Sequence, residues 1–97
     1  MNKKYFVYIV ECSDGSYYTG ITNNVDRRID EHNSENFPKS YTHSRRPVVL
    51  KFSEVFSKVK QAISFEKQVK GWSRAKKEAL IKGDWQEIKR LSNLKKK

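Results

Sequence analysis

A short turn between two runs of strand-forming residues constrains the fold of this chain more than any other feature. Residues 5–11 are mostly β-branched or aromatic, and residues 17–21 have the same character. Between them, Ser13-Asp14-Gly15-Ser16 supplies the residue types that tight turns use. The pattern predicts a β-hairpin at the start of the domain.

The rest of the chain predicts one more strand and four helices. Residues 33–47, which hold both prolines, are expected to form a loop, and Val48 to Phe56 a third strand. Helices are expected where a capping residue precedes apolar residues at helical spacing: from Asn23 or Asn24 to about His32, after Ser57, from Ser73 to Gly83, and after the capping box Asp84-Trp85-Gln86-Glu87. We therefore expect an α+β fold of order β-β-α-β-α-α-α, in which helices flank a small three-stranded mixed sheet.

Length and charge limit the classes of function. Ninety-seven residues make one domain, 1–97, whose modest core buries roughly 60–65% of the unfolded surface and leaves no room for a large cofactor cavity. The net charge is +10, and residues 57–97 hold 13 basic and 4 acidic residues. Such a field attracts polyanions such as nucleic acid. A well-solvated lysine surface is the alternative interpretation.

The sequence also indicates a compartment. No apolar run approaches transmembrane length, and residues 2–4 lead into a strand instead of the apolar stretch of a signal peptide. Cys12 is the single cysteine, so no internal disulfide can form. We expect a cytoplasmic protein with no membrane partner.

One carboxylate falls where polarity is not expected. Glu66 shares a helical side with Ala62, Ile63 and Val69, so it should point inward. A buried carboxylate is costly unless it is paired or binds a cation. A cation site and a salt bridge to a nearby lysine or arginine are the two alternatives.

Four further side chains have both a structural and a functional interpretation. Arg28 and His32, one helical turn apart, project from the same side of the first helix, where they could simply form a solvated surface. Tyr8 and Tyr18 lie ten residues apart on the hairpin, and core packing is the common role of a strand tyrosine. Taken together with Glu66, these four residues occur in an order and at a spacing that indicate a functional site.

In that order the residues resemble the GIY-YIG nuclease superfamily. Phe6-Val7-Tyr8 and Tyr18-Thr19-Gly20 match its two tripeptide motifs, and Arg28, His32 and Glu66 follow. Residues 8–20 and 66–72 are similar to the small stand-alone bacterial members, which are related to the catalytic subunit of structure-specific endonucleases. The resemblance covers a core of about residues 4–80 and leaves a basic C-terminal helix and tail at 84–97. Phe6 stands in place of a glycine of the first motif and Thr19 in place of an isoleucine of the second.

The resemblance implies an endonuclease that needs Mg²⁺ or Mn²⁺ and hydrolyses DNA, with branched or damaged DNA as the expected substrate. By the same resemblance, the site residues are Tyr8 and Tyr18 as motif tyrosines, Gly20 as the glycine that allows close backbone approach, Arg28 and His32 as the phosphate-handling pair, and Glu66 as the metal ligand. Some members add a late asparagine, and Asn93 in or beyond the last helix is not assigned to that role.

The chemistry suits these residue types. Phosphodiester hydrolysis needs an activated water, charge stabilisation at phosphorus and help for the leaving oxygen. A tyrosine, with an ordinary pKa of ~10, acts as a base only when cations favour the phenolate. We therefore expect Tyr8 to position or deprotonate the water, with Tyr18 as its hydrogen-bonding partner and Arg28 on a phosphate oxygen. Which of the two tyrosines carries the proton stays open. His32 would orient the phosphate or the water. All five side chains, Glu66 included, should converge on one shallow face.

Substrate binding would use the basic residues around the site. Tyr41 and Trp72 could stack on exposed bases, although packing between helices is the alternative for Trp72. DNA is the expected partner in preference to RNA, together with a protein partner that selects the substrate. A non-catalytic nucleic-acid-binding module and a repair-partner adaptor are the competing interpretations. The predicted DNA contacts are Arg45, Arg46, Lys70, Arg74, Lys76 and Lys77.

Overall fold

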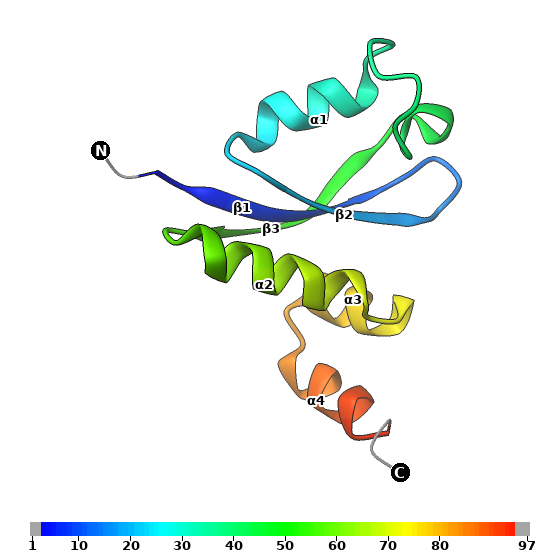
Figure 1. The fold of residues 1–97 in the computed structure, drawn as a ribbon. Coiled ribbons are helices and arrows are strands. Elements are labelled where there is room, and N and C mark those ends of the chain that lie inside the picture. Colours follow the sequence, from blue (N-terminus) through cyan, green and yellow to red (C-terminus); the bar gives the residue numbers. More distant parts are fainter. Residues whose placement is uncertain (1–2, 95–97) are drawn as a thin grey trace.

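A computed structural model describes residues 3–94 and has the expected α+β class and element order (Figure 1). The basic tail predicted at 95–97 lies outside the described residues. A short 3-10 helix interrupts the predicted loop. The elements are β1 (Tyr5–Glu11), β2 (Tyr17–Thr22), α1 (Val25–Asn33), the 3-10 helix η1 (His43–Arg45), β3 (Val49–Phe56), α2 (Val59–Lys70), α3 (Arg74–Lys82) and α4 (Trp85–Leu94).

The three strands form one antiparallel sheet of order β2-β1-β3. The expectation of a mixed sheet is therefore wrong. β2 ends with Thr22 beside Phe6, and α1 with its following loop carries the chain back along the sheet, so that Val49 begins β3 opposite Glu11. Because β3 starts where β1 ends, the two strands run in opposite directions.

Alternate residues of β1 build two cores, one on each face of the sheet. On one face, Ile9 joins a buried cluster with Val69 of α2 and Leu80 of α3. On the other face, Tyr8 belongs to a second cluster against which Ile29 of α1 packs. Figure 1 shows this arrangement, with α1 on one side of the sheet and α2 on the other. The period-two alternation of the strand thus assigns Tyr8 to the face that α1 covers.

Local capping signals place most helix ends correctly. The Asn24 side chain accepts from the backbone N–H of Arg27, Ser73 caps α3, and Gly83 ends α3 with φ of +74°. Asp84 accepts from the N–H of Glu87, but the Glu87 carboxylate pairs with Arg90 and leaves the reciprocal half of the capping box unmade.

The predicted cap at Ser57 is wrong. The strand before α2 runs to Phe56 and the helix begins at Val59, so Lys58 occupies the N-cap position without a side-chain hydrogen bond. Ser57 therefore lies one residue too early to cap the helix. In the part of the chain from 3 to 94, no helix combines the length and apolar character needed to cross a membrane.

Candidate active site

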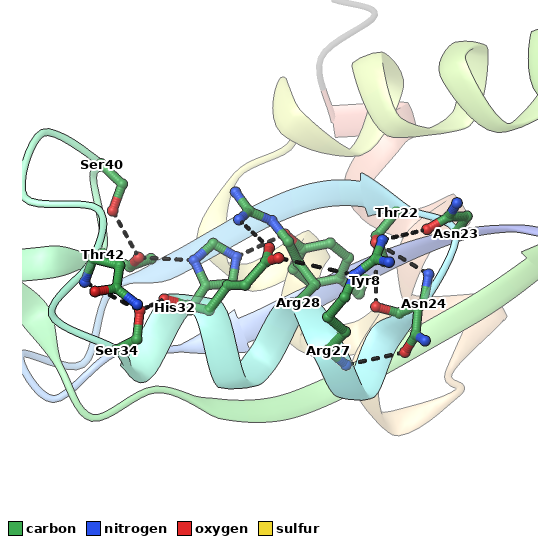
Figure 2. Close-up of polar contacts among 12 residues, drawn as sticks. Tyr8, Thr22, Asn23, Asn24, Arg27, Arg28, His32, Ser34, Ser40 and Thr42 are labelled. Carbon is green, nitrogen blue, oxygen red and sulfur yellow. Dashed lines mark hydrogen bonds and ion pairs between the residues drawn. The ribbon is translucent and has the colours of Figure 1, made fainter.

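The centre of the site is a buried pair formed by Tyr8 of β1 and His32 of α1. The Tyr8 hydroxyl lies 2.7 Å from His32 Nε2, and the two side chains are 1% and 4% exposed. Figure 2 shows them meeting between the strand and the helix. The hydrogen bond expected between Tyr8 and Tyr18 is thus replaced by one between Tyr8 and His32, because the Tyr8 ring extends towards α1.

Gly20 makes this position of Tyr8 possible. Gly20 is the cross-strand neighbour of Tyr8 in the β1–β2 register. A Cβ atom at Gly20 would lie only 2.5 Å from the Tyr8 hydroxyl oxygen and 2.6 Å from Cζ. The glycine of the second motif is therefore required by the close approach of a tyrosine ring to the backbone.

Tyr18 stands beside this pair and is held by two rings. It meets the edge of His32 at a centroid distance of 5.2 Å and stacks on Tyr41 at 5.7 Å with an interplanar angle of 25°. The Tyr8 and Tyr18 rings are 6.4 Å apart. Tyr41 is 45% exposed, so it forms the outer wall of the aromatic group.

Arg28 brings a positive charge to the same face. Its Nη1 lies 3.0 Å from Oε1 of Glu31, and its side chain is 29% exposed. The guanidinium lies beside Tyr8 (Figure 2), and its charge acts to lower the pKa values of both Tyr8 and His32. The helical spacing of Arg28 and His32 thus places both side chains at Tyr8.

Burial keeps the central pair uncharged. Loss of solvent raises the pKa of Tyr8 to about 12, against the opposing effect of Arg28. Loss of solvent, reinforced by Arg28, lowers the pKa of His32 to about 4. At neutral pH the pair is therefore a phenol and a neutral imidazole joined by a hydrogen bond.

Glu66 belongs to α2, the helix that lies on the other side of the sheet from α1 (Figure 1). It stands three residues before Val69 and is 8% exposed. The convergence of Glu66 with the other four side chains on one face stays a prediction, since the contact recorded for its carboxylate is with Lys70. The salt-bridge alternative is observed: Oε2 of Glu66 lies 2.7 Å from Lys70 Nζ.

A charge effect links Lys70 of α2 to Tyr18 of β2, the edge strand of the sheet. The hydrogen bond to Glu66 raises the pKa of Lys70, and the nearby Tyr18 adds to the shift. The Glu66–Lys70 pair therefore lies within electrostatic range of Tyr18.

Comparison with known proteins identifies the domain that carries this site. The family model described as the GIY-YIG catalytic domain matches residues 4–79. The chain belongs to the GIY-YIG family. This is a nuclease family whose members generally use divalent metals, and a nuclease domain implies nucleic-acid binding.

Small GIY-YIG relatives match over most of their length. A UPF0213 protein of Halobacterium salinarum is 49% identical, with 77% of this chain and 96% of that protein covered. One of Staphylococcus haemolyticus is 47% identical, with coverages of 80% and 94%. The solution structure of a UPF0213 protein of Bacillus halodurans is 40% identical with a TM-score of 0.54 and covers 92% of this chain and 97% of its own. A solved protein of E. faecalis is 35% identical with a TM-score of 0.60, with coverages of 84% and 85%.

Two of the predicted DNA contacts shape the loop beside the GIY-YIG site. Arg45 stacks 4.0 Å above the Tyr41 ring and binds Asp14 of the β1–β2 turn at 3.1 Å. Arg46 donates to the backbone oxygens of His43 and Ser34. Both guanidinium groups have protein partners, and contact with DNA stays a prediction for them.

The basic residues of α2 and α3 that were predicted to contact DNA lie in different surroundings. Arg74 lies over the Tyr17 ring and donates to the Gly15 oxygen at 2.6 Å. Lys76 is buried, with Nζ 4.7 Å from the centroid of the Trp72 ring, and Trp72 packs against the core as the packing alternative predicted. Burial and the charge of Lys70 lower the pKa of Lys77. Lys70 and Lys77 are therefore close enough for each to feel the charge of the other.

Sequence reasoning missed the second partner of His32. The hydroxyl of Thr42, which is fully buried, lies 2.8 Å from His32 Nδ1. Thr42 falls in a loop rich in polar residues, where nothing in the local pattern distinguishes it. The available signal was indirect: a buried histidine needs a partner on each ring nitrogen.

Proposed function

We propose that this chain is a divalent-metal-dependent endonuclease that hydrolyses DNA phosphodiester bonds, with branched or damaged DNA as its substrate. The observation that carries the proposal is the buried hydrogen bond of 2.7 Å between the Tyr8 hydroxyl and His32 Nε2, with Arg28 beside it. A phenol, a neutral imidazole and a guanidinium at one site can together take a proton from water and stabilise charge on a phosphate.

In the proposed reaction a water molecule attacks the phosphorus atom. Tyr8 accepts a proton from that water while it gives its own proton to His32 Nε2, and the bond to the leaving 3′ oxygen breaks as that oxygen takes a proton from solvent. Passing the proton on matters because a pKa of about 12 leaves almost no phenolate at neutral pH. The negative charge of a bound phosphate raises the pKa of His32 and so favours the transfer.

Arg28 is the proposed partner of a non-bridging phosphate oxygen. Its side chain is partly open to solvent and its present contact is Glu31, at 3.0 Å. A planar guanidinium matches phosphate geometry and gains interaction as negative charge accumulates in the transition state. Tyr18, packed against His32, would border the substrate on the other side.

Glu66 is the proposed metal ligand, and its chemistry fits Mg²⁺. Among residues 3–94 no group of three or more His, Cys, Asp or Glu side chains could enclose a metal ion. Mg²⁺ needs no such cage, because one or two carboxylates suffice when waters and substrate phosphates complete its shell. Glu66 is the one buried carboxylate of the described residues, and the ion would replace the ammonium of Lys70 beside it. When bound, the metal would supply positive charge to the phosphate.

The basic C-terminal half is the proposed electrostatic surface for DNA. Lys70 and Lys77 are the strongest candidates for phosphate contacts, because Lys70 lies near Tyr18 and the two lysines repel each other. A bound phosphate would relieve that repulsion. No base-reading motif is present in the sequence, so structure-dependent recognition of DNA is proposed in place of sequence readout.

A non-catalytic nucleic-acid-binding module is the second candidate function. The observation that favours it is the ion pair of 2.7 Å between Glu66 and Lys70, which satisfies the carboxylate without a metal. The basic surface would serve either function, so only cleavage distinguishes the two.

A substrate screen with Mg²⁺ or Mn²⁺ tests the proposal, using duplex, flap, fork, junction and single-stranded DNA. We expect nicking of a branched substrate, loss of nicking in Glu66→Ala and survival of DNA binding. Glu87→Ala is the control, since Glu87 pairs with Arg90 on α4, outside the site. Nicking that is insensitive to Glu66→Ala, or DNA binding without nicking in every combination, would reject the nuclease proposal.

A further inference from the structure

Thr42 completes a hydrogen-bonded chain that begins at Tyr8. Its hydroxyl lies 2.8 Å from His32 Nδ1 and 3.3 Å from the hydroxyl of Ser40, and Thr42 is fully buried just before η1. Figure 2 shows Tyr8, His32, Thr42 and Ser40 following one another from the sheet to the loop. The loop therefore supplies the group that touches the far side of the imidazole.

The hydrogen-bonding capacities of these groups decide the direction of the chain. A neutral imidazole has one N–H donor and one acceptor nitrogen. If His32 carried its proton on Nε2, it would donate to Tyr8, and the buried Tyr8 hydroxyl would need a different acceptor for its own proton. Arg28, the charged group beside Tyr8, has only donors. Tyr8 is satisfied when it donates to a bare Nε2.

The Thr42 hydroxyl can accept a hydrogen bond from Nδ1 of His32. With the proton of His32 on Nδ1, the Thr42 oxygen accepts it, and the Thr42 hydroxyl is free to donate to Ser40. Every hydroxyl proton from Tyr8 to Thr42 then has an acceptor. In a site this buried, an unsatisfied polar group costs ~1–3 kcal/mol, so the fully satisfied arrangement is preferred.

We infer that Thr42 is a positioning residue: by accepting the hydrogen bond from Nδ1 of His32 it stabilises the Nδ1–H tautomer, which leaves Nε2 bare for the Tyr8 hydroxyl. The catalytic consequence rests on the proposed function, in which Nε2 receives the proton of Tyr8. The tautomer itself does not depend on that function and can be observed in the free protein.

The direct test is nitrogen NMR of the imidazole rings in the full chain at neutral pH. The chain has two histidines, so His43 serves as an internal reference for His32. We expect Nδ1 of His32 to be protonated in the wild type and in Thr42→Ser, which keeps the hydroxyl. In Thr42→Val, which removes the hydroxyl at similar volume, the Nδ1 proton loses its acceptor, so the share of the Nε2–H tautomer should rise. An Nε2–H tautomer in the wild type, or an unchanged tautomer in Thr42→Val, would overturn the inference.

Single-turnover cleavage and DNA affinity, measured in parallel, test the consequence. Thr42→Val should cleave ~10–100-fold more slowly at unchanged affinity, and Thr42→Ser should recover most of the rate. A changed tautomer with an unchanged rate would refute the positioning role. If the wild type has the expected tautomer and cleaves no DNA, the proposed function fails while the tautomer assignment stands. The wild-type spectrum alone shows which tautomer His32 adopts, so the tautomer can be refuted even if Thr42→Val does not fold.

Discussion

Replacing Gly20 by alanine should both destabilise the protein and damage its site. The added Cβ would lie 2.5 Å from the Tyr8 hydroxyl oxygen, 2.6 Å from Cζ and 2.9 Å from Cε1. Ordinary contact begins at 3.4 Å, so the ring would have to move by about 0.9 Å. Tyr8 is 1% exposed and hydrogen-bonded to His32, so its ring cannot swing into solvent.

The structure allows an estimate of the cost. Overpacking of a buried site costs ~1–3 kcal/mol, and loss of the Tyr8–His32 hydrogen bond adds ~1 kcal/mol. In a domain of this size each kcal/mol lowers Tm by roughly 4–8 °C. We therefore expect Gly20→Ala to lower Tm by roughly 8–30 °C, with cleavage reduced as Tyr8 moves away from His32.

Thermal unfolding followed by circular dichroism measures this effect. Gly71→Ala is the matched control, because its Cβ would meet only backbone oxygens, at 3.6 and 3.9 Å, and Gly71 has a helical φ of −82°. The control should change Tm by less than ~4 °C. A Gly20→Ala variant that unfolds within that margin of the wild type would refute the close-approach argument.

Three further predictions follow from the charges of the site. The pKa of His32 is about 4 in the folded protein and 6.5 ordinarily, so between these values the unfolded chain binds more protons than the folded one. Lowering the pH from 7 to 5 should therefore reduce the free energy of unfolding of the wild type by about 2 kcal/mol more than that of His32→Gln. Parallel denaturant titrations of the two proteins measure this difference. An equal pH dependence in the two proteins would contradict the buried neutral imidazole. Arg28→Ala should slow single-turnover cleavage ~100-fold or more at little cost in affinity, and a wild-type rate would remove its role. The affinity for duplex DNA should fall by powers of ten between ~50 and ~200 mM salt, with a shallower slope in Lys70→Ala/Lys77→Ala; an unchanged slope would exclude both lysines from phosphate contact.

Local signals in the sequence predict the elements well. The turn at Asp14 and Gly15, the caps at Asn24 and Ser73 and the stop at Gly83 each act within a few residues, and each is found where it was expected. Ser57 fails because the position of a cap depends on where the preceding strand ends. The direction of β3 fails as a prediction for a similar reason, since it depends on the path of the chain through α1 and the loop.

The site shows the same division between local and long-range information. Helical spacing places Arg28 and His32 together, and strand alternation assigns Tyr8 to their face. The partner of Tyr8 could not be read from the motif order, because it depends on how α1 crosses the sheet. Glu66 was correctly expected to be buried, but helical periodicity does not say which face of the sheet its helix covers.

Thr42 illustrates the limit most clearly. It is ten residues from His32 in a loop without periodicity, and only the folded loop brings its hydroxyl to Nδ1. Tertiary contacts of this kind cannot be predicted from the composition of the chain or from the spacing of its residues.

The central claim is that the buried Tyr8–His32 pair is the reaction centre of a nuclease. The measurement that tests it most directly is single-turnover cleavage of a flap substrate at saturating Mg²⁺ by Tyr8→Phe, which removes only the hydroxyl that lies 2.7 Å from His32. Tyr17→Phe is the matched control, since the Tyr17 hydroxyl contacts Glu78 and not the site. We predict a loss of ~100-fold or more for Tyr8→Phe, with unchanged DNA affinity and a near-wild-type rate for the control. Cleavage by Tyr8→Phe at the wild-type rate would contradict the account.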